Sequence, residues 1–111
     1  MTDQKSMFKK QIKHSEEIAG TSFNKVVVKE NYQTLLNALG NPTVIGSPDN
    51  KIQLQWQFIN SQNKEQVFTI YDYKSDCPIK DVTDWHIGSK GMSNEKIVRH
   101  LKEYGLEAVI V

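Results

Sequence analysis

Several features that would identify a class of protein are scarce in this chain of 111 residues. Its 14 basic and 13 acidic side chains give a formal net charge of +1, so no overall electrostatic field favours nucleic acid as a partner. No apolar run approaches the roughly 20 residues that a membrane-spanning helix needs, so we expect no membrane partner. The first residues are polar and lack the apolar block of a signal peptide, which favours a cytoplasmic protein.

Cysteine and the common catalytic motifs are also scarce. The single Cys77 excludes an intramolecular disulfide, and no Cys-x-x-Cys or His-x-x-x-His spacing offers a metal site. The sequence contains neither a Gly-x-Ser-x-Gly nucleophile elbow nor a complete phosphate loop of the form Gly-x-x-x-x-Gly-Lys-Ser/Thr. We therefore expect no metal and no cofactor, and we favour a binding protein over an enzyme.

The patterns that are present predict strands first. Apolar residues alternate with glutamines over residues 52–58, which is typical of a half-buried strand. A polar loop at 60–65 then leads to a second strand at 67–74, which has apolar or aromatic residues on both faces and is therefore expected to be central in its sheet. Residues 23–29 are rich in valine and predict another strand, and residues 109–111 predict an edge strand.

Two helices are predicted from apolar spacing and from their capping residues. Residues 31–39 begin at Asn31, and residues 93–104 begin at Ser93. We expect residues 21–111 to form a single α+β domain, with a small mostly antiparallel sheet and two or three helices packed on one face.

Residues 1–20 are predicted to form an N-terminal polar helix or arm. Within them, residues 6–18 carry a thin apolar stripe that includes Phe8 and Ile12. Such a helix gains little from burial, and its lysines face either solvent or a phosphate-bearing partner.

In the predicted helix at 93–104, His100 lies on the polar face and is therefore predicted to be a surface residue.

The stretch of residues 84–91 concentrates the most chemical capability, and we predict that it runs from a short extended segment into a loop before the last helix. The glycines of this loop, beginning with Gly88, would let backbone N–H groups point at an anion, and the Lys90 ammonium would add positive charge. Trp85 is either a stacking surface for a base or a core residue. His86 is either a ligand contact or the partner of a backbone carbonyl.

A second group of candidates lies in the second strand of the hairpin. Tyr71 and Tyr73 share one face and would stack on a base. Asp72 lies on the opposite, apolar face, where a carboxylate needs a partner. That partner is either Lys74 or His86, whose ring nitrogen Asp72 would orient. The predicted ligand-binding residues are Trp85, His86, Gly88, Ser89, Lys90, Tyr71, Asp72 and Lys74, and no catalytic residue or metal ligand is predicted.

Five segments carry a resemblance: residues 21–23, the helix at 32–39 with the glycine and proline after it, the strand at 51–56, FTIYDYK at 68–74 and WHIG at 85–88. Over residues 20–104 the chain resembles small, largely uncharacterised proteins encoded by bacteriophages and other large DNA viruses. The resemblance implies a viral origin and a location in the host cell, but no mechanism. Members of that group often have two glycines after His-Ile, where this chain has Gly88 and Ser89.

The leading hypothesis is a non-catalytic viral protein that binds and sequesters a small phosphorylated or nucleotide signal, countering host antiviral defence, and that works as a homo-oligomer. One alternative is a protein–protein inhibitor of a host defence protein, acting through an exposed strand edge at residues 109–111 or 26–28. Another is a small hydrolase that uses His86 and Asp72. Nucleic-acid binding through the N-terminal lysines is a further, less favoured reading.

Overall fold

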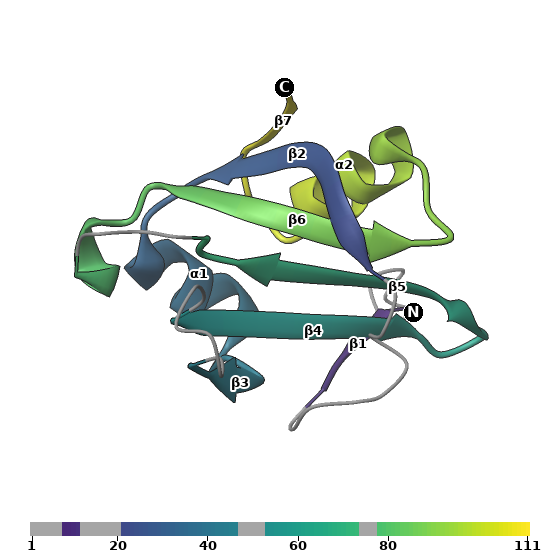
Figure 1. The fold of residues 1–111 in the computed structure, drawn as a ribbon, viewed down its shortest axis with the longest axis horizontal. Coiled ribbons are helices and arrows are strands. Elements are labelled where there is room, and N and C mark those ends of the chain that lie inside the picture. Colours follow the sequence, from purple (N-terminus) through teal and green to yellow (C-terminus); the bar gives the residue numbers. More distant parts are fainter. Residues whose placement is uncertain (1–7, 12–20, 47–52, 74–77) are drawn as a thin grey trace.

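The computed structural model describes residues 8–11, 21–46, 53–73 and 78–111. This described part forms one sheet of seven strands in which every pairing is antiparallel, together with two α-helices and a short 3₁₀ turn (Figure 1). The expected α+β class with a mostly antiparallel sheet is therefore confirmed. The elements are β1 (Phe8–Lys10), β2 (Ser22–Lys29), α1 (Tyr32–Leu39), β3 (Val44–Ile45), β4 (Leu54–Asn60), β5 (Asn63–Tyr71), η3 (Ile79–Asp81), β6 (Asp84–Lys90), α2 (Asn94–Glu103) and β7 (Ala108–Ile110).

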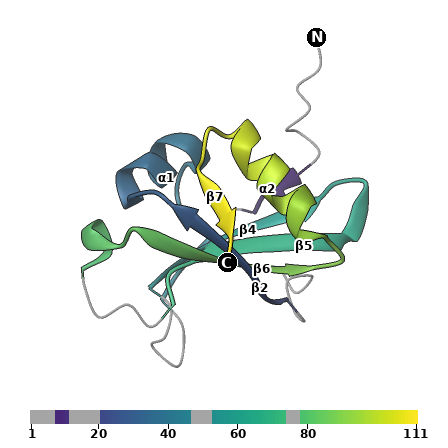
Figure 2. The same cartoon turned by 90° about the horizontal axis from the view of Figure 1, so that it is seen from above.

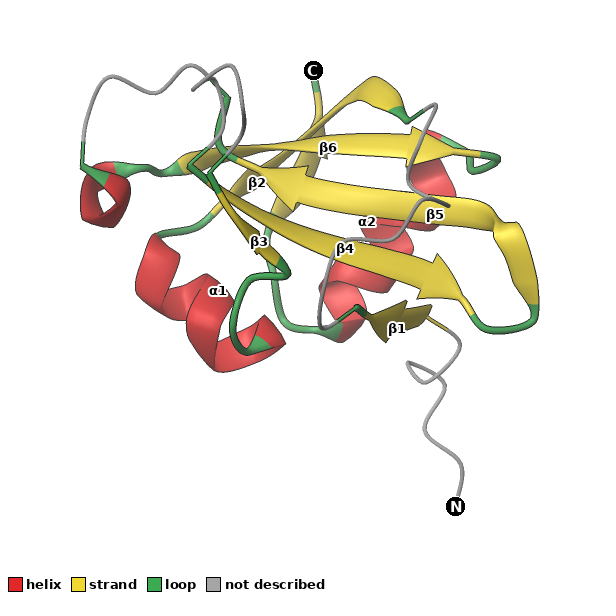
Figure 3. Ribbon diagram, turned by 60° about the horizontal axis from the view of Figure 1, so that its bottom comes forward, coloured by secondary structure: helices red, strands yellow, loops and turns green. Residues whose placement is uncertain are grey.

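The strands follow the order β1-β4-β5-β6-β2-β7, and β3 pairs with β4 outside this path. β1 and β3 share one edge of β4, where β1 pairs with residues 58–60 and β3 with residues 54–55 (Figure 3). β5, β6 and β2 have neighbours on both sides, so the central position predicted for the second hairpin strand is confirmed. β7 pairs with β2 and ends the sheet on the other side, as predicted for an edge strand.

The β4–β5 hairpin is tighter than the sequence predicts. Residues 61–62 form the turn, and β5 already begins at Asn63, inside the predicted polar loop. The rings of Phe58 and Phe68 face each other across the two strands, with centroids 4.8 Å apart and an interplanar angle of 8°. This cross-strand pair fixes the register of the hairpin.

Both predicted helices form and have the predicted caps. The side chain of Asn31 accepts a hydrogen bond from the backbone N–H of Thr34 at 2.8 Å, and that of Ser93 accepts one from Lys96 at 3.2 Å. After α2, Leu106 is buried, and its N–H donates to the Leu101 carbonyl, which closes the helix end. In the part of the chain that the structure describes, no helix has the length and apolar character needed to cross a membrane.

The hydrophobic core combines residues of both helices with one face of the sheet, which we call the inner face. Leu35 of α1 and Leu101 of α2 are fully buried in the same cluster as Trp56, Ile70 and Ile87 of the strands. We call the opposite face of the sheet the outer face. Because side chains alternate along a strand, neighbouring residues of β4, β5 and β6 are divided between these two faces.

The predicted N-terminal helix is wrong for residues 8–10, which form β1 and pair with β4. The helical spacing of Phe8 and Ile12 is a weak local signal, and a short helix with little apolar surface is only marginally stable. Pairing with the edge of β4 gives residues 8–10 backbone hydrogen bonds to a stable strand instead. The rest of that predicted helix, residues 6–7 and 12–18, lies outside the described residues.

Two predictions about exposure are also wrong. Residues 26–28 are not an exposed edge, because β2 lies between β6 and β7 and the side chains of Val26 and Val28 are fully buried. His100 is buried instead of lying on the surface, with its Nδ1 atom 3.5 Å from the Glu103 carboxylate.

Candidate functional site

Strand β6 separates the residues that the sequence placed together. Trp85 is fully buried in the core, and its indole Nε1 donates a hydrogen bond to the Glu30 carbonyl at 2.9 Å. His86, the next residue, pairs with Tyr71 and Val27 and lies on the outer face. Trp85 is therefore a core residue, and the predicted convergence of its indole with His86 and Lys90 does not occur. Alternation along an extended strand explains the difference.

The predicted anion-binding loop is part of the same strand. Gly88 pairs with Thr69 of β5 and Phe23 of β2, and Ser89 is paired on both sides and buried. The backbone groups of these residues serve the sheet, so the prediction that they point at an anion is wrong. Pairing on two sides outweighs the weak strand preference of glycine.

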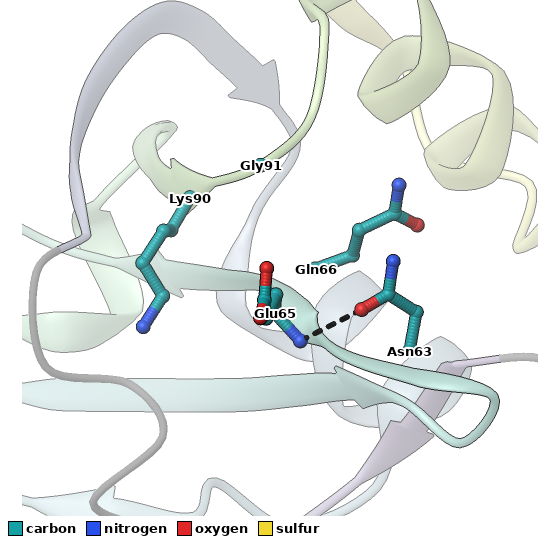
Figure 4. Close-up of a pocket in the computed structure, with 5 residues that line it drawn as sticks. All are labelled: Asn63, Glu65, Gln66, Lys90 and Gly91. Carbon is teal, nitrogen blue, oxygen red and sulfur yellow. Dashed lines mark hydrogen bonds between the residues drawn. The ribbon is translucent and has the colours of Figure 1, made fainter.

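Lys90 ends β6 beside a polar pocket of about 450 Å³ lined by Asn63, Glu65, Gln66, Lys90 and Gly91 (Figure 4). The backbone N–H of Glu65 donates to the Asn63 side chain at 3.1 Å. Gly91 has a φ of 74°, and a Cβ added to it would lie 2.6 Å from the Glu65 carbonyl oxygen. This glycine is needed for the close approach of the β6 end to β5.

Asp72 has a structural role on the inner side of the sheet. It is fully buried, and its Oδ1 atom accepts hydrogen bonds from the backbone N–H groups of Gln53 at 2.8 Å and Leu54 at 2.9 Å. The carboxylate thus fixes the entry into β4. This role differs from the predicted one of orienting His86. The alternative partner, Lys74, lies outside the described residues.

His86 is surrounded by three aromatic rings on the outer face, and we call Phe23, Tyr71, Tyr73 and His86 the ring site. The imidazole stacks with Phe23 at a centroid distance of 4.5 Å and an interplanar angle of 28°, and with Tyr73 at 5.8 Å and 29°. Tyr71 meets it edge to face at 5.9 Å and 79°. Of the predicted site residues, the structure therefore brings Tyr71 and His86 together.

The register of β2 explains how Phe23 reaches His86. Val26 lies opposite Ile87, and Phe23 lies opposite Gly88, so three steps along β2 match one step along β6. This bulge contains Lys25, whose φ of 65° is in the left-handed region. Without the bulge, Lys25 would lie opposite Gly88. The bulge therefore replaces an ammonium with a phenyl ring at this position, where glycine leaves space beside the imidazole.

The ring site encloses a pocket of about 300 Å³ lined by its four rings. Phe23 and Tyr73 remain 42% and 41% exposed, and Tyr71 and His86 are half-buried. Burial lowers the pKa of the His86 imidazole, against the opposing effect of the Asp84 charge. Burial, reinforced by the charge of neighbouring Tyr73, raises the pKa of Tyr71. Burial therefore favours the uncharged forms of His86 and Tyr71, and the pocket suits a flat, weakly polar group.

Sequence reasoning named Tyr73 as a stacking residue but missed Phe23. The common face of Tyr71 and Tyr73 is visible in the alternation of the strand, whereas nothing local marks the bulge that brings Phe23 across from β2.

In the described ranges, no group of three or more His, Cys, Asp or Glu side chains is arranged to hold a metal ion. The resemblance to viral proteins stays a prediction. No known family model matches the chain, and neither curated proteins nor solved structures show a significant match to it.

Proposed function

We propose that this chain is a non-catalytic binding protein whose ring site holds the flat ring of a small ligand, with a nucleotide as the leading class. The observation that supports this most directly is the half-exposed ring cluster around a pocket of about 300 Å³. Pockets for small molecules typically run from about 300 to 1,000 Å³. The ring site is at the small end of that range, which fits one ring system.

Stacking supplies the affinity in this proposal. Base–aromatic stacking contributes roughly 1–3 kcal/mol for each base, and Phe23 and Tyr73 offer ring surface that no core residue covers completely. A neutral His86 adds a third planar surface and two ring nitrogens that can select polar groups at the edge of the ligand. The selectivity expected is for planar heterocycles over aliphatic ligands of the same volume.

A phosphate on the ligand would be held by a nearby cation, and Lys25 is the better candidate. It is exposed in the bulge, two residues after Phe23. Lys90 lies four residues after His86, roughly 13 Å along an extended strand. The proposal therefore moves the expected phosphate contact from Lys90 to Lys25.

The biological part of the proposal comes from the resemblance to viral proteins. In that setting the ligand would be a nucleotide signal of host antiviral defence, and binding would sequester it. A protein that only sequesters its ligand needs no reacting group, which agrees with a site built of rings.

Isothermal titration tests the proposal with nucleosides, linear nucleotides and cyclic nucleotides. Phe23→Ala removes one stacking partner, which should weaken binding by roughly 5- to 150-fold, the equivalent of 1–3 kcal/mol. Lys25→Ala should weaken the binding of nucleotides but not that of nucleosides, which have no phosphate. The matched control is Ile45→Ala, because Ile45 is 79% exposed and lies on β3, away from the ring site.

Two results would overturn the proposal. One is the absence of binding by every compound in the panel to the folded wild-type chain. The other is an equal loss of affinity in Phe23→Ala and Ile45→Ala, because that result would place the ligand elsewhere. Circular dichroism on each variant shows that the fold is intact.

A further inference from the structure

The edge of the sheet formed by β7 is apolar and exposed. Val109, Ile110 and Val111 are 36%, 49% and 64% exposed, and they account for three of the six large exposed hydrophobic side chains in the described residues. Edge strands are usually protected by lysine, proline or a bulge. β7 consists of Ala108, Val109 and Ile110 and has none of these three, so its short length is its one protection. An apolar edge of this kind can pair with another strand.

β7 lies beside α2 (Figure 2), and residues of both elements line a groove. It has a volume of about 300 Å³ and is lined by Glu95, Val98, Arg99, Lys102 and Ile110. Glu95 lies in the first turn of α2 and Lys102 in the last. They are seven residues, or two helical turns, apart and therefore lie on the same side of the helix. The groove thus has an acid at one end of the helix and a base at the other, with Val98, Arg99 and Ile110 between them.

We propose that β7 pairs with β7 of a second copy of this chain, antiparallel and about a two-fold axis, so that the sheet continues from one copy into the other. This proposal does not depend on the ring site, which lies on the outer face.

The charges of the groove favour a second copy over an unrelated strand. A two-fold axis makes the two α2 helices run in opposite directions, and each contact then occurs twice. Glu95 and Lys102 lie at equal distances in sequence from the midpoint between Val98 and Arg99. Antiparallel helices centred there bring Glu95 of each copy opposite Lys102 of the other, and Val98 of each copy opposite Arg99 of the other. The surface is therefore complementary to itself.

The same geometry limits the strength of the dimer. A specific interface usually buries about 800 Å² on each partner, and three residues of strand pairing bury less than that. The helices must supply the remainder, so the dimer should be reversible and should depend on chain concentration. Added salt should weaken it, because exposed charge pairs are screened.

Sedimentation velocity over a wide range of chain concentrations tests the proposal. The wild-type chain should pass from monomer to dimer as its concentration rises. Ile110→Lys should remain a monomer, because the lysine of each copy would then lie at the strand edge that has to pair with the other copy. Ile45→Lys is the matched control: it introduces the same charge at a residue that is 79% exposed on β3, and it should dimerise like the wild type.

A charge exchange tests the arrangement itself. Glu95→Lys alone and Lys102→Glu alone should each weaken the dimer, because both contacts then join like charges. The double variant restores opposite charges at both contacts and should recover dimerisation. Three results would overturn the proposal: a wild-type chain that is monomeric at every concentration, a dimer that persists in Ile110→Lys, or a double variant no better than the single ones. If the chain is monomeric and β7 binds a different protein instead, the first of these results is obtained and the proposal is overturned.

Discussion

Replacing Asp72 with alanine should lower the free energy of unfolding by roughly 2–6 kcal/mol. The carboxylate Oδ1 accepts the backbone N–H groups of Gln53 and Leu54 at 2.8 and 2.9 Å, and Asp72 itself is fully buried. Alanine leaves both donors without this acceptor, and each buried donor that loses its partner costs about 1–3 kcal/mol. Because Leu54 begins β4, the loss falls on a strand that carries both β3 and β5.

Urea unfolding followed by circular dichroism measures this change, and the matched control is Asp84→Ala. Asp84 is also a carboxylate beside the sheet, but its side chain is 55% exposed and its ion pair with Lys29, at 3.2 Å, lies at the surface. Such a pair contributes about 0–1 kcal/mol. If Asp72→Ala were no more destabilising than Asp84→Ala, the structural role assigned to Asp72 would be refuted. A folded Asp72→Asn chain should also keep its affinity for a ring-site ligand. If Asp72 contacted the ligand, this substitution would lower the affinity.

Other substitutions and conditions test the rest of the fold. Gly91→Ala should lower the free energy of unfolding by roughly 1–3 kcal/mol more than Gly105→Ala in the same urea assay. Both glycines have a positive φ, but only at Gly91 would the new Cβ meet backbone, 2.6 Å from the Glu65 carbonyl oxygen. Equal effects of the two substitutions would contradict this. Burial lowers the pKa of both His86 and His100, so the unfolded chain takes up protons first as the pH falls. The free energy of unfolding should therefore have its full value above about pH 6.5 and should decrease as the pH falls below it. Urea midpoints measured as a function of pH should fall less on acidification in a His86→Asn, His100→Asn double variant than in the wild type.

The parts of the fold that could be predicted from the sequence depend on local signals. Asn31 and Ser93 cap the two helices as expected, since a side-chain oxygen next to an apolar stripe acts within a few residues. The alternation around Trp56 predicts its burial correctly. The prediction that this strand is only half-buried is wrong, because Gln57 and Ile59 on the other face of β4 are buried as well. The position of Asp72 on the buried face also follows from alternation, although its two backbone partners come from a distant part of the chain.

The parts that could not be predicted depend on pairing between distant segments. Residues 8–10 become a strand because β4 has an open edge for them, which no local pattern announces. Residues 88–90 look like a glycine-containing loop, yet Gly88 and Ser89 are paired on both sides and Lys90 is paired with β5. Trp85 and His86 come just before them, in the segment that was predicted to be extended. Alternation along that segment already places their two side chains on opposite faces, so the prediction that both line one ligand site is wrong.

The bulge at Lys25 is the feature that argues most strongly for a site on the outer face. A left-handed φ costs a residue with a side chain about 1–2 kcal/mol, and a β2 strand in continuous register would avoid that cost. Such a strand would put Lys25 opposite Gly88 and would remove Phe23 from the imidazole. Core packing does not account for the strained arrangement, because Phe23 remains 42% exposed. Strain that persists in order to hold an exposed ring against a histidine is expected where the ring has a ligand to meet.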